Sequence, residues 1–569
     1  MTIRKTLAVL LAVFTISRAA QQSSVTQYGI TWTFDQAYET GRFFNGDWWV
    51  VGPVTITDIS PGVIHAADGD IHNGWEAKLN NNSKQGFDSR AHGFLDTLIP
   101  SLPYTANQAQ SIVKAVSVDT SEASCRPCLR TADVLTVVES VPPDSGSSVF
   151  RPPYFGLEKT YYNTADIRMD RLPDYAILDS SKDVDWMKSR FERVFLDHRS
   201  GWSGASIHPT ENMPEYGASV ALRTHEGACW LLLGHEPTGK REGAQRYVQT
   251  GLDLYHMLIN GCTWPSNGGH ASGRKLPILM AGYLLNRPDI MDSVSNAPYN
   301  TFQEDGHLYF SQKANGGAGQ VLFGNAVSEK GYWRLVVTRV GLGNRTTRDY
   351  YGYIDGGHRP GTSYQLCCNS QTWKGAALVL KVIPQLETAW NNDHFLTYMD
   401  RWVSHGAWAA PDPCAPPDLR DTTASGDFNS DTLNGSHYGI TYGPDPNTPG
   451  DCIRDTDSSD GIGRFPDLHG TNTDEGGYSS KYNNALYTAY AESVYVTGII
   501  DRPGANLVPK PGSRLPSPVS MEQVRLLGEN FLFHTNEGMV LKPGQVSGTG
   551  VYLVEDITTG LIQKLIIIK

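Results

Sequence analysis

The stretch Ala244-Gln-Arg-Tyr-Val-Gln-Thr-Gly-Leu-Asp-Leu-Tyr-His-Met-Leu-Ile259 decides the fold class that this sequence predicts. Its apolar and aromatic residues recur every three or four positions, which is the period of an α-helix with one broad buried face. Six further segments show similar patterns: 184–198, 217–234, 273–285, 373–390, 393–403 and 481–494. Loops rich in Gly, Asn and Pro separate them. The sequence therefore predicts a mainly α fold from about residue 183 onward.

Short alternating runs lie on both sides of the helical region. Ile30–Phe34, Trp48–Ile56 and Val134–Val138 are typical of β-strands. The segment 503–518 is rich in proline and indicates a linker, and strand character returns from residue 524. We expect a β-rich segment over 21–150 that packs on a helical catalytic domain over 151–500, then a linker over 501–518 and a small β tail over 519–569.

The first twenty residues have the pattern of a secretory signal peptide. Arg4 and Lys5 precede the apolar run Thr6–Ile16, and small residues follow at Ser17–Ala20. No later run reaches about 18 uninterrupted apolar residues, so we expect no membrane span. The sequence predicts an exported protein of the cell surface or the medium, with the periplasm as the alternative.

The charge of the chain bears on its partners. It carries 47 Lys and Arg against 59 Asp and Glu, a formal net charge of −12, which argues against nucleic acid because phosphate binding needs a basic surface. An anionic substrate would need a local basic patch that overcomes this field. The 57 Gly, 27 Tyr and 13 Trp favour loop-rich clefts lined with aromatic rings, such as sugars occupy.

Eight cysteines in an exported chain permit disulfides. Cys125-Arg-Pro-Cys128 has no second Cys-x-x-Cys to complete a metal site, so a local disulfide is the preferred interpretation. Cys414 and Cys452 bracket a loop-rich segment that a second disulfide would close. Cys229 and Cys262 lie in or beside expected helices, where buried free thiols are an equal alternative.

Three loops concentrate polar side chains just before an expected helix. Two share Gly-Gly-His followed by Arg: Asn267-Gly-Gly-His270-Ala-Ser-Gly-Arg274-Lys275 and Asp355-Gly-Gly-His358-Arg359, which leads to Tyr364. The third, residues 208–217, holds Asn212 and Tyr216. Glycine allows close approach of the backbone to a ligand, and cations near a helix N-terminus favour an anion. The alternative is that these are ordinary helix connections in which the histidines satisfy backbone groups.

Two other motif matches are incomplete. Gly234–Lys240 imitates a phosphate-binding loop, but Arg241 occupies the position of the required Ser or Thr. His235-Glu236 is not followed by a second His at the zinc-protease spacing. We therefore expect neither a cofactor nor a metal.

The three loops, in this chain order, resemble the helical-toroid polysaccharide lyases, most closely polysaccharide lyase family 38, whose members cleave glucuronan or alginate. The resemblance covers roughly residues 183–494. It implies an (α/α) barrel of about seven helical hairpins and a secreted enzyme that cleaves a 4-linked uronate polymer by β-elimination.

The resemblance also implies roles for individual residues. Tyr364 would be the proton acceptor and donor, with Asn212, His270 and Arg359 around the uronate carboxylate. Positive charge beside a tyrosine lowers its pKa from about 10, as a base requires. The remaining substrate-binding residues would be Asn267, Arg274, Lys275, His358, Tyr216, Glu236 and Trp264. Arg345 or Arg348 could have the role given to Arg359, and Tyr351 or Tyr353 could have the role given to Tyr364.

Two competing functions stay open at this point. A glycoside hydrolase would use a carboxylate pair, drawn from Glu215, Glu236, Asp253 and Asp355. A non-catalytic glycan-binding protein would use rings such as Trp264 and Trp373 as stacking platforms.

Overall fold

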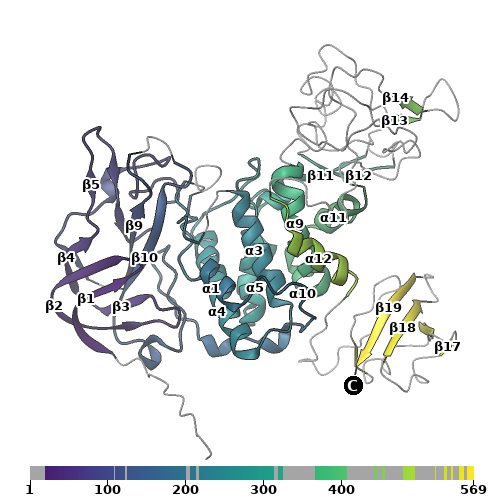
Figure 1. The fold of residues 1–569 in the computed structure, drawn as a ribbon, viewed down its shortest axis with the longest axis horizontal. Coiled ribbons are helices and arrows are strands. Elements are labelled where there is room, and N and C mark those ends of the chain that lie inside the picture. Colours follow the sequence, from purple (N-terminus) through teal and green to yellow (C-terminus); the bar gives the residue numbers. More distant parts are fainter. Residues whose placement is uncertain are drawn as a thin grey trace, which may run out of the picture.

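The computed structural model describes residues 19–107, 109–121, 125–199, 206–212, 217–312, 318–324, 365–405 and 478–493, together with short strands elsewhere. Residues 20–138 contain a large mixed sheet of eight strands, which curls into a half-barrel (Figure 1). Its order is β7-β9-β10-β3-β2-β4-β8, and β1 pairs with β2. The strands are β1 (Ala20–Gln27), β2 (Ile30–Arg42), β3 (Trp48–Val51), β4 (Val54–Ser60), β7 (Trp75–Ala77), β8 (Tyr104–Ala106), β9 (Gln110–Ser117) and β10 (Leu129–Val138).

The two faces of this sheet belong to different cores, because successive side chains of a strand point to opposite faces. Val113 of β9 and Val134 of β10 join the hydrophobic core that the helices share. Their neighbours Ile112 and Leu135 belong to a second core inside the half-barrel, together with Trp32. The sheet therefore serves as one wall of the helical domain and also encloses a core of its own.

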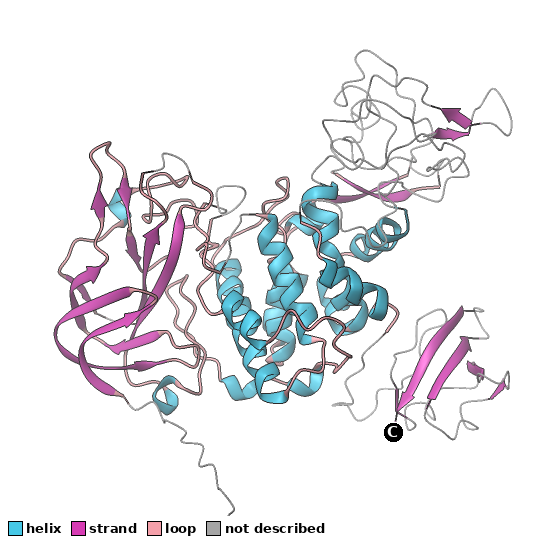
Figure 2. Ribbon diagram, in the orientation of Figure 1, coloured by secondary structure: helices cyan, strands magenta, loops and turns pink. Residues whose placement is uncertain are grey.

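The helices form one group beside the sheet (Figure 2). The central helix α5 is buried at all ten of its residues and packs on α4, α6 and α3, while α3 packs on α9. The helices are α1 (Val184–Phe191), α3 (Ala218–Leu231), α4 (Pro237–Ile259), α5 (Lys275–Leu284), α6 (Pro288–Ser295), α7 (Gln303–Gly306), α9 (Gln371–Val382), α10 (Pro384–Trp390), α11 (Asp393–His405) and α12 (Lys481–Tyr490).

Arg151 links the sheet to the helices. Its Nε donates to Asp47 Oδ2 at 2.7 Å, and its Nη2 pairs with Asp253 of α4. The backbone N–H of Tyr154 also donates to Asp253. All of these groups are buried, and an unpaired charge would be costly there. Asp253 is therefore a structural partner of Arg151.

The expectation of a mainly α protein with an (α/α) barrel of about seven hairpins is wrong. A β half-barrel makes up the N-terminal part, and within the described residues about ten helices follow it and do not form a helical toroid. Each expected helix is confirmed near its place, but Pro384 divides 373–390 into α9 and α10. Strands β11 (Leu308–Ser311) and β12 (Gln320–Phe323) also interrupt the succession of helices. Apolar periodicity identifies single helices, but it contains no information on whether they close into a ring.

Two smaller sheets lie later in the chain. β13 (Thr441–Pro444) pairs with β14 (Cys452–Arg454), and five C-terminal strands follow the order β15-β19-β18-β16-β17. These strands are β15 (Val519–Ser520), β16 (Phe531–His534), β17 (Val540–Leu541), β18 (Gly550–Asp556) and β19 (Leu561–Ile568). Among the described helices, none combines the length and apolar character that a membrane crossing requires. The proposed signal peptide lies outside the described residues, apart from its last two.

Candidate functional site

The first Gly-Gly-His loop is fixed by the side chain of Gln303, at the start of α7. Gln303 Oε1 accepts the backbone N–H groups of Asn267 at 3.0 Å and Ala271 at 3.1 Å. Its Nε2 donates to Ser272 Oγ and to Asn369 Oδ1, and Asn369 in turn donates to the Gly268 carbonyl. Asn267, Gly268 and Ala271 are thus held through their backbone groups, so the loop has a preorganised shape.

A buried carboxylate fixes the C-terminal end of the same loop. Asp197 accepts from Arg274 through both oxygens, at 2.5 and 2.9 Å, and from His208 at 3.0 Å. Its backbone carbonyl accepts from the Trp264 indole at 3.2 Å. Burial of the carboxyl group would raise its pKa, but the charges and hydrogen bonds of Arg274 and His208 outweigh burial and lower the pKa to about 2. Asp197 is therefore ionised and part of the scaffold.

The two cations that end the loop are both paired inside the protein. Arg274 is 1 % exposed and pairs with Asp197. Lys275 is equally buried, and its Nζ lies 2.7 and 2.9 Å from the two Asp305 oxygens. These two ion pairs anchor the first turn of α5. The charges of Arg274 and Lys275 are therefore paired with carboxylates of the chain itself.

His270 has a different setting, because its imidazole is only half-buried. It lies against Gly217, where a Cβ would come within 2.9 Å of His270 Nδ1, and the φ of Gly217 is +59°. Burial lowers the pKa of His270, and the positive charges of Arg126 and Arg274 lower it further. The imidazole is accordingly neutral at pH 7, with a guanidinium nearby.

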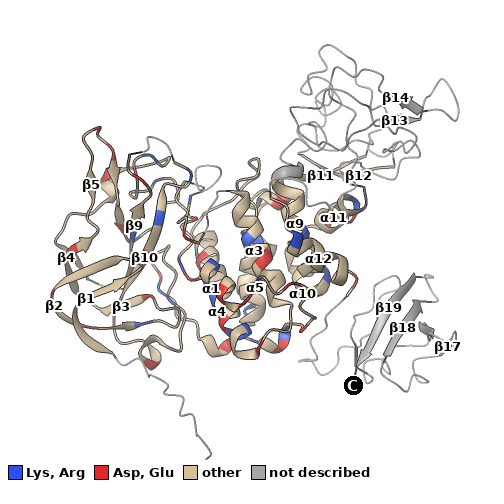
Figure 3. Cartoon of the chain, in the orientation of Figure 1, with Lys and Arg blue, Asp and Glu red and all other residues tan. Residues whose placement is uncertain are grey.

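The sheet contributes that guanidinium. Arg126 is exposed and lies in a loop closed by the Cys125–Cys128 disulfide, as the sequence predicts. The backbone N–H of Cys128 donates to the Ser206 carbonyl at 2.8 Å, which joins this loop to the helical part. Figure 3 shows Lys and Arg positions among the loops between the sheet and the helices. Nothing in the local sequence around Arg126 indicates this role, because its charge acts on a histidine that is distant in the sequence.

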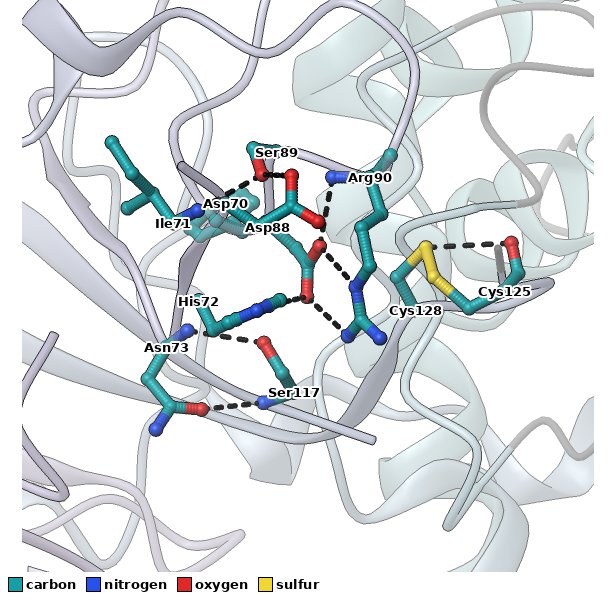
Figure 4. A network of polar contacts seen from close by, with 12 residues as sticks. Asp70, Ile71, His72, Asn73, Asp88, Ser89, Arg90, Ser117, Cys125 and Cys128 are labelled. Atoms are coloured by element: carbon teal, nitrogen blue, oxygen red, sulfur yellow. Dashed lines mark hydrogen bonds and ion pairs between the residues drawn. A yellow bond between two sulfur atoms is a disulfide. The ribbon is translucent and has the colours of Figure 1, made fainter. Parts of the chain in front are cut away.

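A network of polar contacts lies beside the disulfide (Figure 4). Asp88 accepts from Arg90 through both oxygens, at 3.0 and 2.8 Å, and lies 3.4 Å from His72 Nδ1. Asp88, Cys125 and Cys128 are close enough for a metal site, with ligand atoms within 4.8 Å of one another. However, the two sulfurs are bonded to each other and the carboxylate is paired with Arg90. In this oxidised state the three groups therefore do not fit a metal ion.

The other predicted site residues are scattered. Asn212 is buried, and its Nδ2 donates to the Arg193 carbonyl at 3.3 Å. Glu236 is exposed and caps α4 by accepting from Thr238 and Gly239. Asn267 is exposed near His270, whereas Trp264 is buried and stacked on Phe302. Tyr216, His358, Arg359 and Tyr364 lie outside the described residues.

Comparison with known proteins adds no relative. No family model, no curated protein and no solved structure matches this chain.

Proposed function

We propose that this chain is an exported polysaccharide lyase that cleaves a 4-linked uronate polymer by β-elimination. The observation that carries the proposal is the neutral, half-buried imidazole of His270, presented by a preorganised loop and influenced by the charge of Arg126. This pair offers a proton acceptor and a cation for a carboxylate. Those are two of the three groups that elimination from a uronate needs, and the third is an acid for the leaving oxygen.

The reaction begins at C5 of the uronate. The carboxylate pairs with Arg126, which stabilises the negative charge that develops when the C5 proton leaves. A ring nitrogen of His270 accepts this proton, the electron pair forms the C4=C5 double bond, and the C4–O4 bond breaks. The departing O4 takes a proton from a general acid. The resemblance to family 38 assigns both proton transfers to Tyr364, and we retain Tyr364 for the second.

The described residues give less support to the alternatives. Of the four carboxylates considered for a hydrolase, Asp253 pairs with Arg151 and Glu236 caps α4. Both rings considered as stacking platforms, Trp264 and Trp373, are buried in the core, at 1 % and 0 % exposed. Asp253 and Glu236 therefore have structural roles rather than the roles of a hydrolase pair. The two buried tryptophans do not present a surface on which a sugar could stack.

A substrate panel tests the proposal. The purified protein is incubated with glucuronan, alginate and other uronans while ultraviolet absorbance is followed, because elimination creates a conjugated double bond. A carboxyl-reduced form of the same polymer is the matched control, since it lacks the group that acidifies C5. We expect absorbance to rise with one uronan and to stay constant with its reduced form. Release of reducing ends without absorbance would establish hydrolysis instead.

A further inference from the structure

The half-barrel contains a cavity of about 510 Å³, remote from the His270 loop in sequence and lined by other residues. This volume falls in the range of about 300–1,000 Å³ that is usual for small-molecule sites, and mouths of β-barrels are a common place for them. The lining residues are Asp58, Ile59, Gly62, Val63, His65, Ile71, Trp75, Asp96, Ile99, Pro100, Ser101, Leu102 and Lys114.

A buried amine forms part of the cavity wall. Lys114 of β9 is 0 % exposed, and it lies opposite Trp75 of β7 in the strand register, so both side chains are on the inner face of the half-barrel. Its Nζ donates to the Asn73 carbonyl, and within the described part of the chain that oxygen is its one hydrogen-bond acceptor. An ammonium group has three N–H donors. Two donors are therefore available to a molecule in the cavity.

The charged neighbours of Lys114 lie at the rim or deeper in the sheet. Asp58, Asp96 and His65 are exposed, so solvent screens their charges. Asp133 of β10 is the register partner on the other side of Lys114, and it accepts from the Trp32 indole. Burial lowers the pKa of Lys114 to about 7, although the charge of Asp58 acts in the opposite direction. Burial also raises the pKa of Asp133 to about 7.

The rest of the wall is mostly apolar. Ile59, Ile71 and Ile99 line the cavity beside Trp75, together with Val63, Pro100 and the exposed Leu102. Such a wall favours a hydrocarbon or aromatic body over a ring covered with hydroxyl groups, because buried hydroxyls without partners are costly. The buried amine favours an anion at one end.

We infer that this cavity is a binding site for a small monocarboxylate with an apolar body, whose carboxylate accepts hydrogen bonds from Lys114 Nζ. The site is independent of the proposed lyase reaction. A carboxylate beside Nζ stabilises the ammonium form, so binding is coupled to protonation of Lys114. Affinity therefore falls about tenfold for each pH unit above the pKa of Lys114.

Calorimetry on the full chain tests the inference with 3-phenylpropionate as the probe. The alcohol 3-phenylpropanol has the same body without the charge, and glucuronate has the charge on a hydroxylated body. We expect the acid to bind at least about tenfold more tightly than either at pH 7. At pH 8 its binding should take up a proton, which appears as an enthalpy that depends on the buffer. Equal binding of the alcohol, tighter binding of glucuronate, or no binding of the acid would each overturn the inference.

Three variants locate the effect. Lys114→Met should lose the preference for the acid and the proton uptake, whereas Asp133→Asn should keep both, which separates the two groups that titrate near pH 7. Ser101→Trp is placed at the exposed rim, where it should block the cavity without disturbing the core. Its control is Ser181→Trp, at an exposed position in the helical part. If Lys114→Met does not fold, unchanged binding to Ser101→Trp still shows that the acid binds elsewhere and contradicts the inference.

Discussion

Arg274 and Asp197 form a two-point ion pair in the interior, with Nη2 2.9 Å from Oδ1 and Nε 2.5 Å from Oδ2. The pair joins the end of the Gly-Gly-His loop to the segment before α3. Because both side chains are almost fully buried, each charge depends on the other to offset the loss of its hydration.

Removal of one partner should therefore lower the free energy of unfolding. We expect Arg274→Met to lower the free energy of unfolding by about 3–5 kcal/mol, since the buried charge of Asp197 would lose its ion pair and keep only the hydrogen bond to His208. Urea unfolding measures the change. Arg287→Met is the control, because the Arg287–Asp289 pair is 40 and 50 % exposed and should contribute less than about 1 kcal/mol. Similar losses in the two variants would contradict a structural role for Arg274.

The buried carboxyl of Glu304 gives a prediction of pH dependence. Burial raises its pKa to about 7, while Oε1 accepts the Gly273 N–H at 2.7 Å. An unfolded carboxyl has a pKa near 4.3, so between about pH 4 and pH 7 the folded protein binds a proton that the unfolded chain has released. The stability contribution of Glu304 therefore decreases as pH rises through this window.

Glu304→Gln removes this titration with little change of shape. We expect the variant to be more stable than wild type at pH 8, by about 1–3 kcal/mol, and nearly equal to it at pH 4. Denaturant unfolding at the two pH values provides the comparison. A difference that is the same at both pH values would show that Glu304 has the same pKa in the folded and unfolded states.

The contact between Gly217 and His270 gives a test of the shape of the site. Gly217→Ala places a methyl group 2.9 Å from His270 Nδ1 in a backbone conformation that L-residues disfavour. We expect lyase activity to fall at least about tenfold, because small displacements of a catalytic group have effects of this size. Gly234→Ala is the control, since its φ is not positive and its nearest neighbour is at 3.4 Å. Full activity of Gly217→Ala would contradict a catalytic role of His270.

Arg126 should influence the pH at which activity declines in acid. If His270 is the base, kcat/KM falls as its imidazole becomes protonated, at a pH below the ordinary value of about 6.5. Burial is the larger cause of the lowered pKa, so Arg126→Gln should move the acid limb only part of the way upward, and should also raise KM for the uronan. An acid limb that does not move would exclude Arg126 as a neighbour that acts on His270.

Local patterns in the sequence predict the positions of the helices well. They do not predict how the helices are arranged relative to one another. The period over 244–259 is confirmed within α4, and the Cys125–Cys128 disulfide is confirmed as well. For Cys229 and Cys262 the sequence left two alternatives open, and the structure has buried free thiols. The failure is the barrel, because closure of a ring depends on contacts between distant helices. The extent of the β half-barrel also exceeds what short alternating runs indicate.

The candidate site shows the same limit at the level of single residues. A loop with Arg274 and Lys275 before a helix has one sequence pattern whether the cations contact a ligand or Asp197 and Asp305. Only the fold distinguishes the two cases. Likewise, Arg126 becomes a candidate only once the sheet packs against the helices. Gln303, which fixes the loop, resembles any other polar residue in the sequence.

The most direct test of the central claim is the initial rate of ultraviolet absorbance increase with the best uronan, for wild type and for His270→Gln. The control is His235→Gln, because His235 is also half-buried but is stacked on Trp230 at 3.8 Å. We predict that His270→Gln lowers the rate at least about a hundredfold, the usual contribution of general base catalysis, while uronan binding persists and His235→Gln stays active. A His270→Gln variant that forms the unsaturated product at the wild-type rate would contradict the assignment of the site.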